Sequence, residues 1–229
     1  MRPASAASTS AYGTEELVDA LTAEDLLDAY QRMLQEDEVS IYIVGDVDEK
    51  AMEEKIRSLS AFKDRPALER KPYEQFTATQ KDEVRKREKQ EMKQGKLHLG
   101  FSTPVTFKHP DYPKMQITNG VFGGFAHSKL FMNVREKESM AYYASSSYAS
   151  HYGLLYVMAG IDAELEEKAV NLIKEQLHAL QQGEITDLEM EQTKALLNNG
   201  IKSAFDSARG QIEVFDQFKE LDEQFTAEK

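Results

Sequence analysis

The chain contains no cysteine and no tryptophan among its 229 residues. Without cysteine it can form no disulfide, no Cys-ligated zinc site and no thiol nucleophile. This absence fits a reducing compartment, so we expect a cytoplasmic protein. No apolar run approaches the roughly 18 residues of a membrane span. The amino-terminal residues also lack the charged and apolar regions of an export signal. These absences predict a soluble protein with no membrane partner.

Basic side chains are few relative to acidic ones, 28 against 40, which leaves a net charge of −12. This balance argues against nucleic acid or anionic lipid as a partner and favours a basic peptide. A basic cluster within residues 81–89 is interrupted by acidic side chains, so we interpret it as a solvated surface. The hydrophobic content of 41% supports a globular fold.

The first third of the chain shows a recognisable order of elements. Residues 1–13 begin with an Ala- and Ser-rich stretch that lacks apolar periodicity, and we interpret them as a flexible lead or an expression remnant. Thr22 and Asp25 have the spacing of a capping box, which predicts a helix start. The pattern then predicts a buried strand over residues 39–45 and a second helix after it. Residues 63–95, with many charges and two prolines, are typical of a linker.

The remaining residues, 96–229, form a second region. Alternation of apolar and polar residues over 97–102 predicts a strand with one buried face. We expect a helix over about 111–122, a glycine loop, a further helix containing Arg135, and two strands around a turn near 150–153. A long helix over 163–182 should end at Gly183, and a capping box at Thr186 should start another. The predicted core face of that last helix carries Met190, Leu197, Ile201 and Ala204.

Arg135 and Tyr142 form the most informative motif. They lie seven residues apart, where the pattern predicts the end of a helix and the start of a strand. A guanidinium and a phenol can both hydrogen-bond a peptide carbonyl oxygen. Taken alone, this spacing fits better an arginine that covers a sheet edge and a tyrosine that packs beside it.

The motif, with the glycine loop at Gly123 and Gly124 upstream of it, resembles a segment of the M16 (pitrilysin- and insulysin-like) metallopeptidases. In that family an arginine and a tyrosine at this spacing hold the substrate backbone. The resemblance implies an α+β fold of M16 metallopeptidase-like (LuxS/MPP-like) two-layer repeats, each a mixed, largely antiparallel sheet packed against helices. Residues 14–62 then resemble the C-terminal part of a first repeat, and residues 96–229 a second repeat truncated at its C-terminus.

M16 peptidases use an inverted zinc motif, His-x-x-Glu-His, which is absent here. The resemblance therefore implies no catalytic and no metal-binding residue in this chain, with zinc in a catalytic half or partner subunit. It implies the substrate-binding, non-catalytic region of a bacterial-type (M16B) zinc peptidase, inactive alone. Its binding residues would be Arg135, Tyr142, Gly123 and Gly124. The alternative is an inactive M16-like subunit with a binding or structural role.

Three smaller expectations accompany this interpretation. Gly123 and Gly124 would permit backbone torsions closed to other residues, although they equally fit a tight turn that starts a helix. His127 is interpreted as a surface histidine at a helix start in preference to a binding residue. Apolar surface left bare by truncation would favour a homodimer of the fragment.

Overall fold

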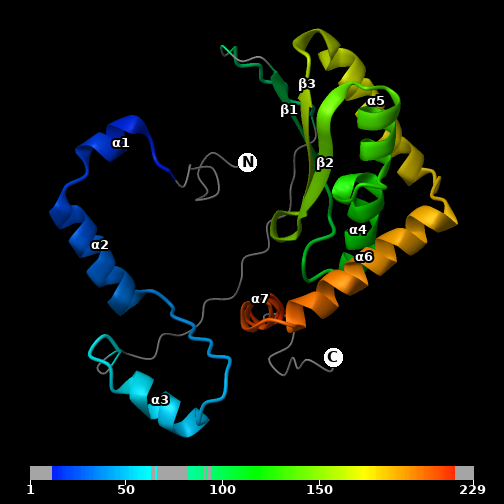
Figure 1. The fold of residues 1–229 in the computed structure, drawn as a ribbon. Helices are drawn as coiled ribbons and strands as arrows, with labels where there is room; N and C mark the ends of the chain where they lie inside the picture. The colour runs from blue at the N-terminus through cyan, green and yellow to red at the C-terminus, as the bar shows by residue number, and fades with distance from the viewer. Residues whose placement is uncertain (1–11, 63–64, 66–81, 90, 92–93, 220–229) are drawn as a thin grey trace. The chain divides into compact units, whose positions relative to one another are not determined.

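The computed structural model describes residues 12–62, 65, 82–89, 91 and 94–219 (Figure 1). The chain divides into two compact units. One unit contains the described residues up to 65 together with 206–219, and the other contains the described residues from 82 to 205. Most of the predicted lead and most of the predicted linker lie outside the described residues. Within the part that is described, no helix is both long and apolar enough to cross a membrane.

The described residues of the first unit form four helices, α1 (Glu15–Ala20), α2 (Ala23–Glu36), α3 (Glu49–Arg57) and α7 (Ala208–Phe218). The predicted capping box is confirmed. The Thr22 hydroxyl accepts a hydrogen bond from the Asp25 amide at 3.2 Å, and the Asp25 carboxylate accepts one from the Thr22 amide at 2.9 Å. These bonds satisfy amides that the first turn of α2 leaves without helical partners.

The buried strand predicted over residues 39–45 is wrong. This segment forms no strand with any described residue, and the side chains of Val39, Ile41 and Ile43 are exposed. Alternation of apolar residues favours a strand only where a neighbouring strand satisfies the backbone amides and carbonyls. No such neighbour lies among the described residues of this unit.

The second unit contains a three-stranded antiparallel sheet in the order β1–β3–β2. Its strands are β1 (Gly95–Ser102), β2 (Ala141–Ala149) and β3 (Leu154–Ile161), and the alternating burial predicted for β1 is confirmed. β2 and β3 are joined by a single 3₁₀ turn that ends at Gly153, whose φ of 58° lies in the left-handed region. A Cβ at Gly153 would also meet the carbonyl oxygen of Thr103 at 2.5 Å, so glycine is required there.

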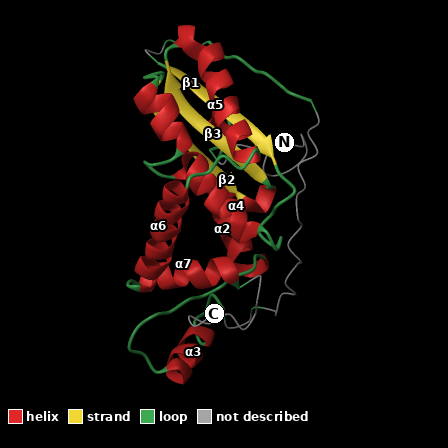
Figure 2. Ribbon diagram, turned by 90° about the vertical axis from the view of Figure 1, so that its right-hand side faces the viewer, coloured by secondary structure: helices red, strands yellow, loops and turns green. Residues whose placement is uncertain are grey.

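Helices α4 (Tyr112–Asn119) and α5 (Glu166–Gln181) lie to one side of this sheet (Figures 1 and 2). The core forms between the sheet and the helical segments, and its most buried members are Val121, Phe122, Leu130, Val134, Leu155, Val157, Ala159, Ile161, Ala169 and Ile173. Helices on one face of an antiparallel sheet make a two-layer α+β unit, which confirms the predicted fold class.

The two C-terminal helices of the sequence prediction are confirmed in outline. α5 begins after a 3₁₀ turn (Ala163–Leu165) and is followed by Gly183 at φ 78°. The capping box at Thr186 starts α6 (Asp187–Phe205). The predicted core face of α6 is only partly right, because Ile201 is 59% exposed while Thr193 is buried. α6 packs closely where Thr193 meets Gly120, and Ile201 lies two turns beyond that contact.

The basic cluster near residue 85 has acidic partners. Arg85 pairs with Glu83 and Glu167, and Arg87 pairs with Glu166. These ion pairs are exposed, as the predicted solvated surface requires, while Lys81 lies outside the described residues.

Candidate functional site

The predicted glycine loop is only partly right: residues 125–128 form a turn, but Gly123 and Gly124 themselves lie in a π-helical turn, η2 (Gly120–Gly124), that continues α4. The reason is close packing. A Cβ at Gly123 would meet the Ser146 amide nitrogen at 2.6 Å and the Leu130 side chain at 2.7 Å. Only a residue without a side chain lets this turn lie directly against β2.

The torsional role predicted for Gly123 and Gly124 is also wrong, since neither residue has a positive φ. A Cβ at Gly124 would lie 3.2 Å from Asn119, a tight contact within the same turn. Gly123 meets β2 at Ser146, four residues past Tyr142, or about 13 Å along the strand. The glycines therefore shape the packing of η2, and a binding role for them stays a prediction.

His127 lies in the turn after η2 and is half-buried. Its Nε2 lies 2.8 Å from the Thr193 hydroxyl, and its ring stacks on Phe125 with the ring centroids 5.7 Å apart. The predicted surface histidine is thus a packing residue that joins this turn to α6.

Arg135 lies near the end of a second π-helical segment, η3 (Leu130–Lys137), which leads into β2. Its guanidinium carbon lies 4.5 Å from the centre of the Phe131 ring, and its Nε lies 3.6 Å from the Glu136 carboxylate. The side chain is 40% exposed. The ring supports the flat face of the guanidinium while its N–H donors can still reach solvent.

Tyr142 lies in a β-bulge at the start of β2. Ala141 pairs with Ile161 and Tyr143 pairs with Gly160, so Tyr142 has no partner on β3. The extra residue places Tyr142 and Tyr143 both outward, between the buried Ala141 and Ala144. Bulges re-aim side chains in this way and recur beside functional sites.

The Tyr142 hydroxyl donates a hydrogen bond to the Asp162 carboxylate at 3.1 Å. This bond, together with the negative charge of Asp162, raises the pKa of the Tyr142 phenol above its ordinary value of 10.0. Tyr142 as a whole residue remains 55% exposed. Arg135 and Tyr142 therefore both stand at the η3–β2 junction with much of their surface exposed. Sequence reasoning did not single out Asp162, because the bond to Tyr142 joins residues 20 positions apart in the chain.

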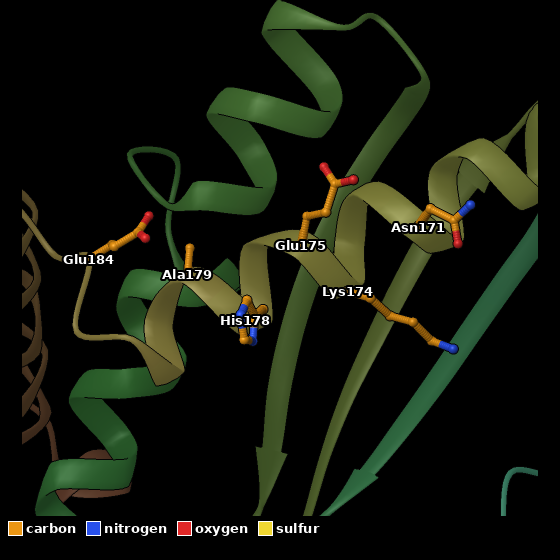
Figure 3. A pocket seen from close by; sticks show the side chains of 6 residues that line it. All are labelled: Asn171, Lys174, Glu175, His178, Ala179 and Glu184. Atoms are coloured by element: carbon orange, nitrogen blue, oxygen red, sulfur yellow. The ribbon is translucent and has the colours of Figure 1, made fainter.

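Other candidate surfaces carry less chemistry. An open hollow on α5 is lined by Asn171, Lys174, Glu175, His178, Ala179 and Glu184. Figure 3 shows Glu175 and Lys174 pointing away from each other, and Lys174 is paired with Glu83 at 2.9 Å. These polar side chains do not converge on one point, so the hollow is not built to hold a ligand.

The part of the chain that the structure describes contains no group of three or more His, Asp or Glu side chains that could hold a metal ion. All five histidines lie in this part. A zinc site needs three or four such ligands around one point. The described residues therefore do not fit a zinc ion.

Residues 20–197 match the family model of the peptidase M16 inactive domain. Over 208 residues the chain is 40% identical to a probable inactive metalloprotease, YmfF, of Bacillus subtilis, which covers 87% of this chain and 46% of that protein. It is 25% identical to an uncharacterized zinc protease, YmxG, of the same organism, over 87% of this chain and 48% of that protein. The chain thus spans about half the length of these relatives.

A crystal structure of a conserved protein from Enterococcus faecalis has a similar fold. The TM-score is 0.79 at 38% identity, and the match covers 96% of this chain and 52% of that one. The family match extends over most of the chain and includes both Arg135 and Tyr142. By this match the chain belongs to the M16 peptidase family, as an inactive M16-like domain.

Proposed function

We propose that this chain is the substrate-binding, non-catalytic region of an M16 zinc metallopeptidase, and that it holds extended peptides for hydrolysis elsewhere. The observation that carries the proposal is the exposed Arg135–Tyr142 pair at the η3–β2 junction of an M16 inactive domain. We assign the substrate contacts to these two residues.

Arg135 is suited to bind a peptide carbonyl. Its contact with Glu136 is long, at 3.6 Å, so most of its N–H donors remain available to a ligand. Its flat face rests on Phe131, which reduces the conformational freedom lost when a ligand is bound. A guanidinium held in this way would orient an extended peptide main chain, and correct orientation can supply a large share of an enzyme's rate enhancement.

The hydrolytic chemistry would belong to another part of the protein or to a partner subunit. The described residues do not fit zinc, whereas one relative that the chain matches carries the name zinc protease. A zinc ion supplies an activated water for peptide hydrolysis. The net charge of −12 and the absence of cysteine support a basic peptide substrate and a cytoplasmic setting.

Peptide binding tests the proposal. Fluorescence anisotropy would follow a labelled, unstructured peptide with Lys residues flanking an apolar centre. Arg135→Ala should weaken binding roughly tenfold, as expected when one charged hydrogen-bond donor is lost. Arg87→Ala is the matched control, because it removes an exposed arginine of the same unit that pairs with Glu166. Equal affinity of wild type and Arg135→Ala would refute the assignment.

The second candidate function is an inactive subunit with a structural or binding role. The relative named a probable inactive metalloprotease favours it, at 40% identity. The same assay separates a purely structural subunit from the proposed function, because such a subunit would not bind the labelled peptide at all.

A homodimer of the chain is a further proposal about its partners. The exposed apolar side chains of the first unit, among them Leu26, Leu27 and Tyr30, would supply the contact surface. Light scattering after size-exclusion chromatography would give the mass. A monomer of 26.0 kDa at all concentrations would contradict this proposal.

A further inference from the structure

We infer that Asp162 is a positioning residue of the peptide site. By accepting a hydrogen bond from the Tyr142 hydroxyl, it leaves the phenol oxygen as an acceptor for a peptide N–H, beside the carbonyl that Arg135 binds. This inference rests on the proposed function and names the atoms of the peptide that the site recognises.

The fold brings the two residues together through the register of the sheet. Ala141 at the start of β2 faces Ile161 at the end of β3, so the residues that follow them in the chain, Tyr142 in the bulge of β2 and Asp162 just past β3, lie at the same end of the sheet. The bulge at Tyr142 frees its backbone from the ladder. The hydroxyl then lies 3.1 Å from Oδ1 of Asp162.

The carboxylate of Asp162 does not cap the helical turn that follows it. Asp162 precedes the 3₁₀ turn that leads into α5 and has the extended torsions of a helix cap, φ −76° and ψ 135°. An aspartate there usually accepts a hydrogen bond from the amides of the first turn. The Asp162 side chain makes no such cap bond. It accepts the bond from Tyr142 instead.

The hydrogen-bonding capacity of each group determines whether the Tyr142 hydroxyl donates to a ligand or accepts from it. An ionised carboxylate can only accept, so the single proton of the Tyr142 hydroxyl points to Asp162. What the hydroxyl still offers a ligand is its lone pairs. A peptide unit presents one acceptor, C=O, and one donor, N–H. Arg135 can only donate hydrogen bonds, and so it matches the peptide C=O. The Tyr142 hydroxyl, with its proton directed to Asp162, can only accept one from a ligand, and so it matches the peptide N–H.

At a given distance, a charged acceptor attracts the hydroxyl proton more strongly than a neutral carbonyl does. A peptide carbonyl that sought the same proton would have to displace the carboxylate. The raised pKa of the Tyr142 phenol has the same cause, since ionisation would place two negative oxygens side by side.

The first test concerns the bond itself and requires no peptide. NMR of the chain labelled with ¹³C at the tyrosine ζ-carbon would follow each phenol with pH, and Tyr142→Phe would assign the signal. Asp162→Asn should lower the pKa of Tyr142, and Asp162→Glu should restore part of the shift. Glu164→Gln is the matched control, because it removes a charge from the same turn. A Tyr142 titration that is identical in wild type and Asp162→Asn would overturn the inference.

The second test concerns the peptide. The labelled peptide would be compared with versions in which one backbone amide at a time is an ester, which removes the N–H. One ester should weaken binding to the wild type about tenfold. In Tyr142→Phe the same ester should weaken peptide binding only slightly. In Asp162→Asn it should weaken binding less than it does in wild type. Glu164→Gln should behave as wild type.

The outcomes separate the two claims. If the wild type does not bind the peptide at all, both the proposed function and this inference fail. If the wild type binds and Arg135→Ala weakens binding, but no ester position depends on Tyr142 or Asp162, only the positioning role of Asp162 is overturned.

Discussion

The Nζ of Lys129 lies 2.9 Å from Oε1 of Glu189. The two side chains are only 11% and 18% exposed, so this pair is more shielded from solvent than a typical surface ion pair. Glu189 also accepts a hydrogen bond from the Thr186 amide at 2.8 Å and so closes the capping box of α6. One carboxylate thus joins the start of α6 to the segment that carries Arg135.

Glu189→Gln should lower the free energy of unfolding by about 1–2 kcal/mol at neutral pH, because it weakens a cap and a shielded ion pair together. Urea unfolding measures this. Glu213→Gln is the control, since its pair with Arg209 is exposed, and its effect should stay within about 0.5 kcal/mol. Equal losses in the two variants would contradict the importance of the Lys129–Glu189 contact.

The same carboxylate predicts a pH dependence. Burial acts to raise the pKa of Glu189, but hydrogen bonds from Thr186 and Lys129 and the charge of Lys129 outweigh it and lower the pKa below 4.5. Because the folded state has the lower pKa, this stabilisation is present above pH 4.5 and is lost as the pH falls through the folded value. Between about pH 7 and about pH 3, wild type should lose more stability than Glu189→Gln. Urea unfolding of the two proteins at a series of acidic pH values measures this. A loss of stability in wild type that is no larger than the loss in Glu189→Gln would contradict the prediction.

Gly123→Ala should destabilise the second unit by about 1–3 kcal/mol, because the added methyl group meets the backbone of Ser146, which cannot rotate away. Gly200→Ala is the matched control in α6, where nothing lies within 4 Å of the added Cβ. That variant should gain up to about 1 kcal/mol from helix propensity. Thermal or urea unfolding of both proteins should therefore give shifts of opposite sign.

Tyr148 should contribute a loss of stability at alkaline pH. Its hydroxyl donates to the Val105 carbonyl at 2.6 Å, and burial, with a smaller effect of Tyr112, raises the pKa of the phenol to about 12. Since the folded pKa exceeds the ordinary value of 10.0, the stabilisation is present below pH 10 and is lost as the pH rises through about 12. Tyr148→Phe should cost about 1 kcal/mol at neutral pH and show a shallower alkaline decline. Absorbance of ionised tyrosine and urea unfolding would follow the two effects.

Zinc analysis should find less than one zinc per chain after incubation with zinc and desalting. The described residues hold no set of ligands around one point, and the chain has no cysteine. Elemental analysis by mass spectrometry checks this. One tightly held zinc per chain would show that this chain does hold a metal, and the proposed division of roles would fail with it.

Part of this protein could be predicted from sequence because the responsible interactions are local. The capping boxes at Thr22 and Thr186 join residues three apart, and the alternation along β1 reports burial one residue at a time. The resemblance to M16 peptidases rested on a short run around Arg135, and the family match confirmed it. The peptide contacts assigned to Arg135 and Tyr142 stay a prediction.

The sequence by itself thus determined the helix starts, the order of elements in the second unit, and the family. Only the tertiary structure decided that Gly123 is needed for contact with Ser146, that residues 39–45 form no strand with the described residues, and that Tyr142 bonds Asp162. The physical reason is the same in each case. A cap, a turn or a periodic stripe depends on residues a few positions apart, whereas a close contact, a strand or a shared proton depends on a partner that only folding brings within reach.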